Sequence, residues 1–501
     1  MHRMFDVPEL LQFVIECLVE PGYQHPCIFV CKYWAEIVLD ILWEEVEDLE
    51  PLFRIMGPLT EGSNNGTLQY LPGPDDWERF RYYTSRIRSV IYYPKFRQNR
   101  YARKLFPMLA MTNDQGALFP NLRRLEWAAE DLETLATLTY FMHDKVESLL
   151  ITFSDDLAAD PAHSLSSFVF HTIKRAPYLG YLDISGDEWI GPQILHLLRG
   201  LKKLEEVTIP CFCATSEVLQ ELSSRVMLKT ITFSGDGDMD MRLYPNLTAA
   251  AFPSLETLIL RLHMSDLIHM FKSDVHFERL TMLCLNEAAY SRTGIIQDLL
   301  GLIATKCPVL KTLYLDTDYQ APENQADEAI PVSLDDLKPL MQCRLLESFT
   351  LRHDRALGLT DGDVEVLARA LPGLIRINLN ADPPEEQRPA MTLQSLVTFV
   401  SHCPRLGELG LYMDGTSAGD VVIPEHGLPF YHLEGISVGA SHISDPPQVA
   451  ALLARIIHPG CVLRKSWQST TTRRPMLDKW AEVRNLLPTM LRLVHDVRSE
   501  R

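Results

Sequence analysis

The chain has 501 residues, with 47 lysines and arginines against 66 aspartates and glutamates, a formal net charge of -19. This acidic balance argues against a nucleic acid as the main partner, and we find neither a secretory signal nor an apolar run of about 18 residues that could cross a membrane. Ten cysteines without framework spacing are typical of a reducing compartment, so we expect a cytoplasmic or nuclear protein.

Two helical segments are predicted first. Asp6-Val-Pro-Glu9 is typical of a helix start, with a capping aspartate and a proline in the first turn, and Pro21-Gly22 ends this helix. A second segment, from Cys27 to Trp43, carries apolar residues on more than one helical face. Because a unit of about 45 residues buries too little surface to be stable alone, part of this apolar surface should contact another body.

Residues 5 to 45 resemble the F-box, a helical module whose pattern runs Leu-Pro, paired leucines, Val-Cys-x-x-Trp and Leu-Trp. The sequence departs from this pattern at Val7, where leucine is usual, and in the turn over residues 20 to 26, which lacks the usual acidic residue followed by leucines. The matching pieces are Val7-Pro-Glu-Leu-Leu11, Val30-Cys-Lys-Tyr-Trp34 and Leu39-Asp-Ile-Leu-Trp43.

The resemblance implies that residues 1–48 form an all-α F-box hairpin that binds a Skp-type adaptor and, through it, a cullin. The chain would then be the substrate-recognition subunit of a ubiquitin ligase. The alternative is a hairpin that caps the following domain and recruits no ligase, and exposed apolar surface on the first 45 residues separates the two. The resemblance assigns adaptor binding, or holding the helices together, to Pro8, Leu10, Leu11, Val30, Trp34, Leu42 and Trp43.

Residues 49–118 follow the hairpin. We predict a helix over Asp75 to Val90. The whole segment is interpreted as a helical linker or as an atypical first repeat.

From residue 119 to residue 440 the chain repeats a Leu-x-x-apolar-x-apolar segment twelve times. The first positions advance by 24 to 36 residues, with a mean of about 28, which is typical of leucine-rich repeats. Amphipathic stretches such as 295–303 and 393–400 lie between copies, so each repeat should be a strand plus a helix. The first positions are Leu122, Val146, Leu179, Leu204, Leu228, Leu255, Leu280, Leu310, Leu346, Leu374, Leu406 and Leu433.

Neither element of such a repeat can cover its own apolar face. We therefore predict that neighbours stack into an α/β leucine-rich-repeat solenoid (horseshoe), with the strands on its inner wall. Residues 441–501 are interpreted as a C-terminal helical cap. An F-box followed by leucine-rich repeats recurs in ubiquitin-ligase substrate receptors, so each resemblance supports the other.

The sequence offers little catalytic chemistry. Gly435-Ile-Ser-Val-Gly439 matches the nucleophile-elbow pattern, but Ser437 falls inside the twelfth predicted strand and only Asp445 and His458 follow as partners. An esterase is therefore the least favoured alternative. We expect no enzyme activity, no metal and no cofactor.

Recognition of a protein substrate is expected on the strands. Side chains alternate across a strand, so the third, fifth and seventh positions of each repeat should face the inner wall. Arginine and tyrosine are enriched at binding hot spots, and arginines would suit an acidic or phosphorylated segment. The candidate substrate-binding residues are Arg261, Tyr314, Arg352, Arg376, Asn378 and Tyr412.

Overall fold

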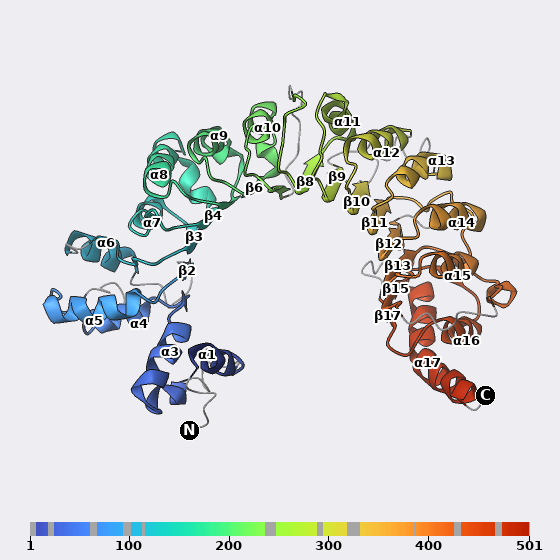
Figure 1. Cartoon of the computed structure of the whole chain (residues 1–501), viewed down its shortest axis with the longest axis horizontal. Coiled ribbons are helices and arrows are strands. Elements are labelled where there is room, and N and C mark those ends of the chain that lie inside the picture. The colour runs from blue at the N-terminus through green and yellow to red at the C-terminus, as the bar shows by residue number, and fades with distance from the viewer. Residues whose placement is uncertain are drawn as a thin grey trace. The chain divides into compact units, whose positions relative to one another are not determined.

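The computed structural model describes residues 7–18, 25–60, 68–93, 102–112, 116–159, 161–235, 247–287, 294–317, 331–384, 387–424, 432–465 and 473–499. The chain divides into two compact units, residues 1–214 (unit 1) and residues 215–501 (unit 2). Both units are built from parallel strands with helices along one face of them (Figure 1).

The N-terminal hairpin of unit 1 consists of helix α1 (Pro8–Glu16), the 3-10 helix η2 (His25–Phe29) and helix α3 (Lys32–Leu42). Val7 is the N-cap of α1 and makes no side-chain cap hydrogen bond, whereas the aspartate predicted to cap it lies outside the described residues. The second predicted helix is divided, because Cys31 is extended, with φ -166° and ψ 168°, and becomes the N-cap of α3.

The segment after the hairpin contains strands as well as helices. The helix predicted over 75–90 is too long, because its last residues belong to a strand. Val90 lies between Val46 and Leu125 of the neighbouring strands, and this pairing outweighs the local helical periodicity. The elements are β1 (Glu45–Val46), α4 (Glu50–Met56), α5 (Pro74–Thr84), β2 (Ser89–Tyr92) and α6 (Ala102–Thr112).

The rest of unit 1 follows the predicted repeats. Among the described residues of this unit, strands β1 to β6 lie side by side in chain order. The further elements are β3 (Arg124–Ala129), α7 (Leu132–Leu138), β4 (Ser148–Phe153), η4 (Asp155–Ala159), α8 (Pro161–Arg175), β5 (Tyr181–Ser185), η5 (Glu188–Ile190), α9 (Gly191–Gly200), β6 (Glu206–Pro210) and η6 (Cys211–Cys213).

Unit 2 continues the same alternation, with β7 to β13, β15 and β17 side by side in chain order. A separate pair, β14 (Asp414–Gly415) and β16 (His442–Ile443), lies beyond the ends of β13 and β15. The repeat elements are α10 (Ser216–Ser223), β7 (Thr230–Ser234), β8 (Thr257–Leu262), α11 (Met264–Lys272), β9 (Met282–Glu287), α12 (Ile295–Lys306), β10 (Thr312–Thr317), α13 (Leu334–Leu337), η8 (Lys338–Gln342), β11 (Ser348–His353), α14 (Asp361–Ala370), β12 (Arg376–Leu379), α15 (Leu393–His402), β13 (Glu408–Leu411), η9 (Ala418–Asp420) and β15 (Gly435–Ser437).

The repeated apolar positions form the core. In every copy the first, fourth and sixth residues are buried, as Leu374, Ile377 and Leu379 are around β12. Equivalent residues of neighbouring strands lie in register, so apolar side chains stack from one repeat to the next. Burial of this apolar surface stabilises the fold by about 25 cal/mol per Å². The twelve predicted copies coincide with strands β3 to β13 and β15, and the chain folds as an α/β leucine-rich-repeat solenoid.

Polar caps tie successive repeats together. Thr360 caps α14 by accepting a hydrogen bond from the amide of Asp363. The carboxylate of Asp361 accepts from the amide of Thr392 at 2.9 Å and from its hydroxyl at 2.7 Å, and Thr392 is itself the N-cap of α15. These contacts therefore fix where α14 and α15 begin, whereas the hydrophobic period alone locates a helix start only roughly.

The C-terminal segment adds helix α16 (Pro446–Ile456), strand β17 (Val462–Arg464) and helix α17 (Arg474–Ser499). Trp480 of α17 is buried and donates its indole N–H to the carbonyl of Ser441 at 2.8 Å. Strand β17 pairs with β15, so the sheet extends past the last predicted copy. None of the described helices combines the length and the apolar character needed to span a bilayer.

Candidate protein-binding surfaces

The N-terminal hairpin has a small apolar core of its own. Leu11 and Ile15 of α1 pack with Val38 of α3, and none of the three is more than 1% exposed. Apolar packing between α1 and α3 therefore holds the hairpin together. The partly buried residues around this core are Cys27, Ile28, Trp34, Ile37, Ile41 and Leu42.

Further apolar side chains of the hairpin face solvent. Val7, Leu10 and Phe13 follow one another at three-residue spacing, beside the stripe of α1 that is buried against α3. Phe13 is 64% exposed and Phe29 is 87% exposed, although large aromatic side chains are usually well buried. We call this surface the hairpin patch. It consists of Val7, Leu10, Phe13, Phe29, Val30 and Tyr33.

The residues assigned by the F-box resemblance divide between this patch and the core. Pro8, Leu10 and Val30 are exposed. Leu11 is fully buried, so it does not offer a surface to an adaptor and instead holds α1 against α3. The adjacent leucines 10 and 11 have different roles because consecutive helical residues point about 100° apart.

The three remaining assigned residues are half-buried. Trp34 and Leu42 pack against the hairpin core. Trp43 packs on Tyr83 at the end of α5, with ring centroids 5.0 Å apart. Substitutions at these positions would therefore disturb the hairpin itself as well as any partner contact.

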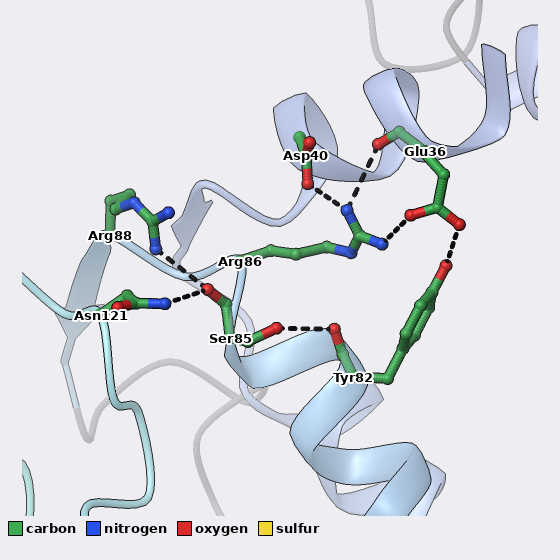
Figure 2. A network of polar contacts seen from close by, with 7 residues as sticks. All are labelled: Glu36, Asp40, Tyr82, Ser85, Arg86, Arg88 and Asn121. Carbon is green, nitrogen blue, oxygen red and sulfur yellow. Dashed lines mark hydrogen bonds and ion pairs between the residues drawn. The ribbon is translucent and has the colours of Figure 1, made fainter. Parts of the chain in front are cut away.

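Arg86, in the turn between α5 and β2, joins the hairpin to the segment that follows it (Figure 2). Its guanidinium donates to the side chains of Glu36 and Asp40 on α3 and lies 4.6 Å from the ring centroid of Tyr82. Tyr82 donates its hydroxyl to Glu36 at 2.7 Å. The hydrogen bond from Tyr82 and, after it, that from Arg86 favour the charged carboxylate, so the pKa of Glu36 is lowered.

Main-chain hydrogen bonds reinforce this connection. The carbonyl of Glu44 accepts from the amides of Arg88 at 2.8 Å and Ser89 at 2.9 Å. The carbonyl of Ser85 accepts from the side chains of Arg88 at 3.0 Å and Asn121 at 2.9 Å (Figure 2). Within unit 1 the hairpin is thus fastened directly to the first strands of the sheet.

In unit 2 the helices lie along one face of the strands, and we call the opposite face the open face (Figure 1). Its side chains are mainly polar. Strand register places these side chains in rows across the sheet. One row contains Arg261, Asn286, Asp316 and Arg352, and a second contains Tyr314, Thr350, Asn378, Gly410 and Ser437. Four of the six predicted substrate-binding residues therefore lie in two adjacent rows.

Arg352 and Tyr314 share one acidic partner. Arg352 donates to Asp316 Oδ2 at 2.8 Å, and the Tyr314 hydroxyl donates to the same oxygen at 3.0 Å. Burial raises the pKa of Tyr314, so its phenol stays protonated and remains a donor at neutral pH.

Arg376 is also paired. Glu408 accepts from Arg376 at 2.7 Å and from Arg464, on β17, at 2.6 Å. These ion pairs are solvent-exposed and each contributes no more than about 1 kcal/mol. The open face is therefore a mixed surface of balanced charges rather than a uniformly basic one.

Tyr412 differs from the expectation. It is only 3% exposed, and its ring lies 6.2 Å from that of His442, so it belongs to the interior and offers no surface to a substrate. The physical reason is that β13 ends at Leu411, so the alternation of side chains along a strand does not extend to Tyr412. Arg261 keeps its place on β8 and donates to the carbonyl of Gly235 at 3.2 Å.

Ser437, the centre of the nucleophile-elbow pattern, lies at the end of β15. The two candidate partners are used elsewhere. Asp445 caps α16 by accepting from the amide of Gln448 at 3.1 Å, and His458 Nδ1 accepts from the amide of Gly460 at 3.0 Å. The side chain of Ser437 instead lines a small pocket of the open face.

Several features of these surfaces depend on the fold and on no local sequence motif. The exposed Phe13 and Phe29 match no motif, because the apolar period of a helix does not say which of two adjoining faces stays open. Arg86 and Glu36 are 50 residues apart, and only the fold brings them together. Gly410 and Arg464 likewise reach the open face only through the pairing of strands that are distant in the chain.

No protein-family model matches the chain, and no curated protein matches it. Its fold resembles that of the protein in the crystal structure of a TLR13–ssRNA13 complex, with a TM-score of 0.34 and 15% identity over 70% of this chain and 50% of the other. It also resembles a Bacteroides fragilis protein, with a TM-score of 0.26 and 13% identity over 49% of this chain and 67% of that one. The chain thus spans half the length of the TLR13 chain, and these likenesses concern the fold alone.

Proposed function

We propose that this chain is the substrate-recognition subunit of a Skp-cullin-F-box ubiquitin ligase. In this role the hairpin patch binds a Skp-type adaptor, and the open face of unit 2 binds a protein substrate. The observation that carries the proposal is the hairpin patch, because six apolar side chains exposed on one short helical hairpin are typical of a protein-binding site. Two of them, Leu10 and Val30, are also F-box motif positions.

The chain would supply no chemistry of its own in such a complex. It would hold the substrate close to the conjugating enzyme and so raise the effective concentration of substrate near activated ubiquitin. The net charge of -19 favours protein partners over nucleic acids, and the reducing compartment suggested by the cysteines is the cytoplasm or nucleus.

A second candidate is a leucine-rich-repeat interaction scaffold whose hairpin caps the first strands. The observation in its favour is the fastening of α3 by Arg86 and Tyr82, since a cap also needs fixed contacts with the repeat that it covers. The two candidates differ in whether the hairpin patch has a partner.

The test is a binding isotherm between the full chain and a purified Skp-type adaptor. A variant carrying Leu10→Ser and Phe29→Ser removes apolar surface from the patch without touching the hairpin core. We expect the wild type to bind and the variant to lose at least about tenfold in affinity, because exposed apolar anchors carry most of such binding energy.

The matched control is Leu71→Ser, which removes a 72% exposed leucine outside the hairpin and should leave adaptor affinity unchanged. Helical circular dichroism of all three proteins checks that the hairpin is intact. If the folded wild type does not bind the adaptor, the scaffold candidate replaces the ligase subunit.

A further inference from the structure

A pocket of about 120 Å³ lies on the open face of unit 2, where strands β11, β12 and β15 end. Sites for cofactors and drug-sized molecules usually enclose about 300–1,000 Å³. This pocket therefore has room for a single side chain. Its polar walls include Arg352, Asn378, Asp382, Ser437 and Lys465.

One glycine lines the pocket and another lies in the row beside it. Gly410 lies between Asn378 and Ser437 in strand register, and a Cβ atom on it would stand 2.7 Å from Asn378 Cγ. Gly439 has φ +50°, and a Cβ atom there would stand 2.2 Å from the carbonyl oxygen of Ala381. Neither position has space for a larger side chain, so the backbone there stays close to Asn378 and Ala381.

Among the described residues that line or back the pocket, the charges leave an excess of one positive charge. Arg352 and Lys465 line it, while Arg473 lies behind Asp382 and pairs with it at 3.0 Å. Arg352 is paired in turn with Asp316. In this described set three cationic groups stand against two carboxylates, so one further monoanion would balance their charge, whereas a dianion would exceed it.

Neutral donors complete the set. Asn378 Oδ1 already accepts from the amide of Ala381 at 3.0 Å, which leaves the amide N–H groups of Asn378 as donors. The hydroxyl of Ser437 lines the same pocket. Guanidinium, ammonium, amide and hydroxyl groups together are the donors that a carboxylate accepts from.

We propose that this pocket binds one carboxylate of a partner protein, an aspartate or glutamate side chain in an extended segment that lies across the open face. The size of the pocket fits a side chain rather than a cofactor or a drug-sized molecule, and its charge excess fits a monoanion. The inference rests on the proposed role of the open face in protein recognition and names the group that is recognised.

The experiment selects binders of the immobilised full chain from a random dodecapeptide library. The selected peptides are then titrated against wild type, Lys465→Met and Lys465→Glu. We expect an acidic residue at one shared position, and at least about tenfold weaker binding when that residue becomes its amide. Lys465→Met should weaken the binding of the acidic peptides, and Lys465→Glu should abolish it. Neither substitution should change the affinity for the amide versions of these peptides.

The matched control is Arg369→Gln on helix α14. Arg369 pairs with Glu365 away from the open face, so this substitution should not alter any titration. Selected peptides that bind equally well as acid and as amide would overturn the carboxylate pocket and leave protein recognition standing. A phosphoserine version that binds more tightly than the acid, and loses more with Lys465→Met, would replace the carboxylate with a phosphoryl group. Failure to select any peptide would contradict recognition by the open face as well as the pocket.

Discussion

Arg473 donates to Asp382 at 3.0 Å, and the two side chains are only 2% and 7% exposed although 91 residues separate them. Arg473 immediately precedes α17, and Asp382 follows β12. A buried charge pair of this kind links the C-terminal helix to the repeats and also supports one wall of the pocket described above.

Removing one partner of this pair should destabilise unit 2. Arg473→Met removes the buried guanidinium that pairs with Asp382 at 3.0 Å, which costs roughly 3 kcal/mol. We expect a lower urea midpoint with an unchanged m-value. The exposed neighbour Arg474 supplies the control, since Arg474→Met should leave the midpoint where it is.

A double-mutant cycle tests whether the pair itself is responsible. Adding Asp382→Asn to Arg473→Met removes the buried carboxylate charge that Arg473 compensates, so the double variant should be more stable than the single one. Equal stability of the two would mean that Asp382 does not depend on Arg473.

Two glycine-to-alanine substitutions should change the stability of unit 2 in opposite directions. Gly439→Ala places a Cβ atom against the carbonyl oxygen of Ala381 at a residue with φ +50°, and it should destabilise unit 2 by about 1–3 kcal/mol. Gly301→Ala, in the helix α12, meets no atom within 4 Å and should stabilise it by about 0.5–1 kcal/mol. Thermal unfolding measures both, and a stabilising Gly439→Ala would contradict the close approach of these turns.

Acidification should loosen the hairpin. The pKa of Glu36 is lowered in the folded chain by Tyr82 and Arg86, so its contribution to stability is present above the ordinary value of 4.5 and is lost as the pH falls through the lowered value. Glu36→Gln removes this dependence. We expect the urea midpoint of wild type to exceed that of the variant near neutral pH and to approach it in acid.

The control for this prediction is Glu47→Gln, an exposed glutamate outside the Arg86 network, which should keep the wild-type profile. Hydrogen exchange of the α3 amides locates the effect, since opening should begin there and leave unit 2 protected. Parallel pH profiles for wild type and Glu36→Gln would contradict a stabilising role for the contacts of Glu36 with Tyr82 and Arg86.

Thiol reactivity should separate exposed from buried cysteines. Burial raises the pKa of Cys403 to about 12 and that of Cys343 to about 11, which suppresses their thiolates at neutral pH. Cys17 and Cys31 are exposed. Iodoacetamide labelling followed by peptide mass spectrometry should modify the exposed pair in the native chain and the buried cysteines only in urea. Rapid native labelling of Cys403 would be inconsistent with its burial.

The strand positions were predictable because they follow a local rule. A strand that must bury alternate residues against a helix repeats its apolar positions, and the copies at Leu374 and Leu406 coincide with β12 and β13. The same rule misplaced the end of α5, where Val90 continues a helical pattern but pairs with Val46 and Leu125. Sheet hydrogen bonds from distant residues decided that boundary.

The amino-acid sequence by itself determined the repeat period, the helix that follows most strands and the apolar N-terminal hairpin, because each depends on residues close together in the chain. Only the tertiary structure decided which apolar residues of that hairpin stay exposed, as Phe29 does while Leu11 is buried. It also decided that Tyr412 is internal and that Arg464 and Arg376 share Glu408. Exposure and charge pairing depend on neighbours that are distant in the chain, which are α3 for Leu11 and other strands of the sheet for Glu408.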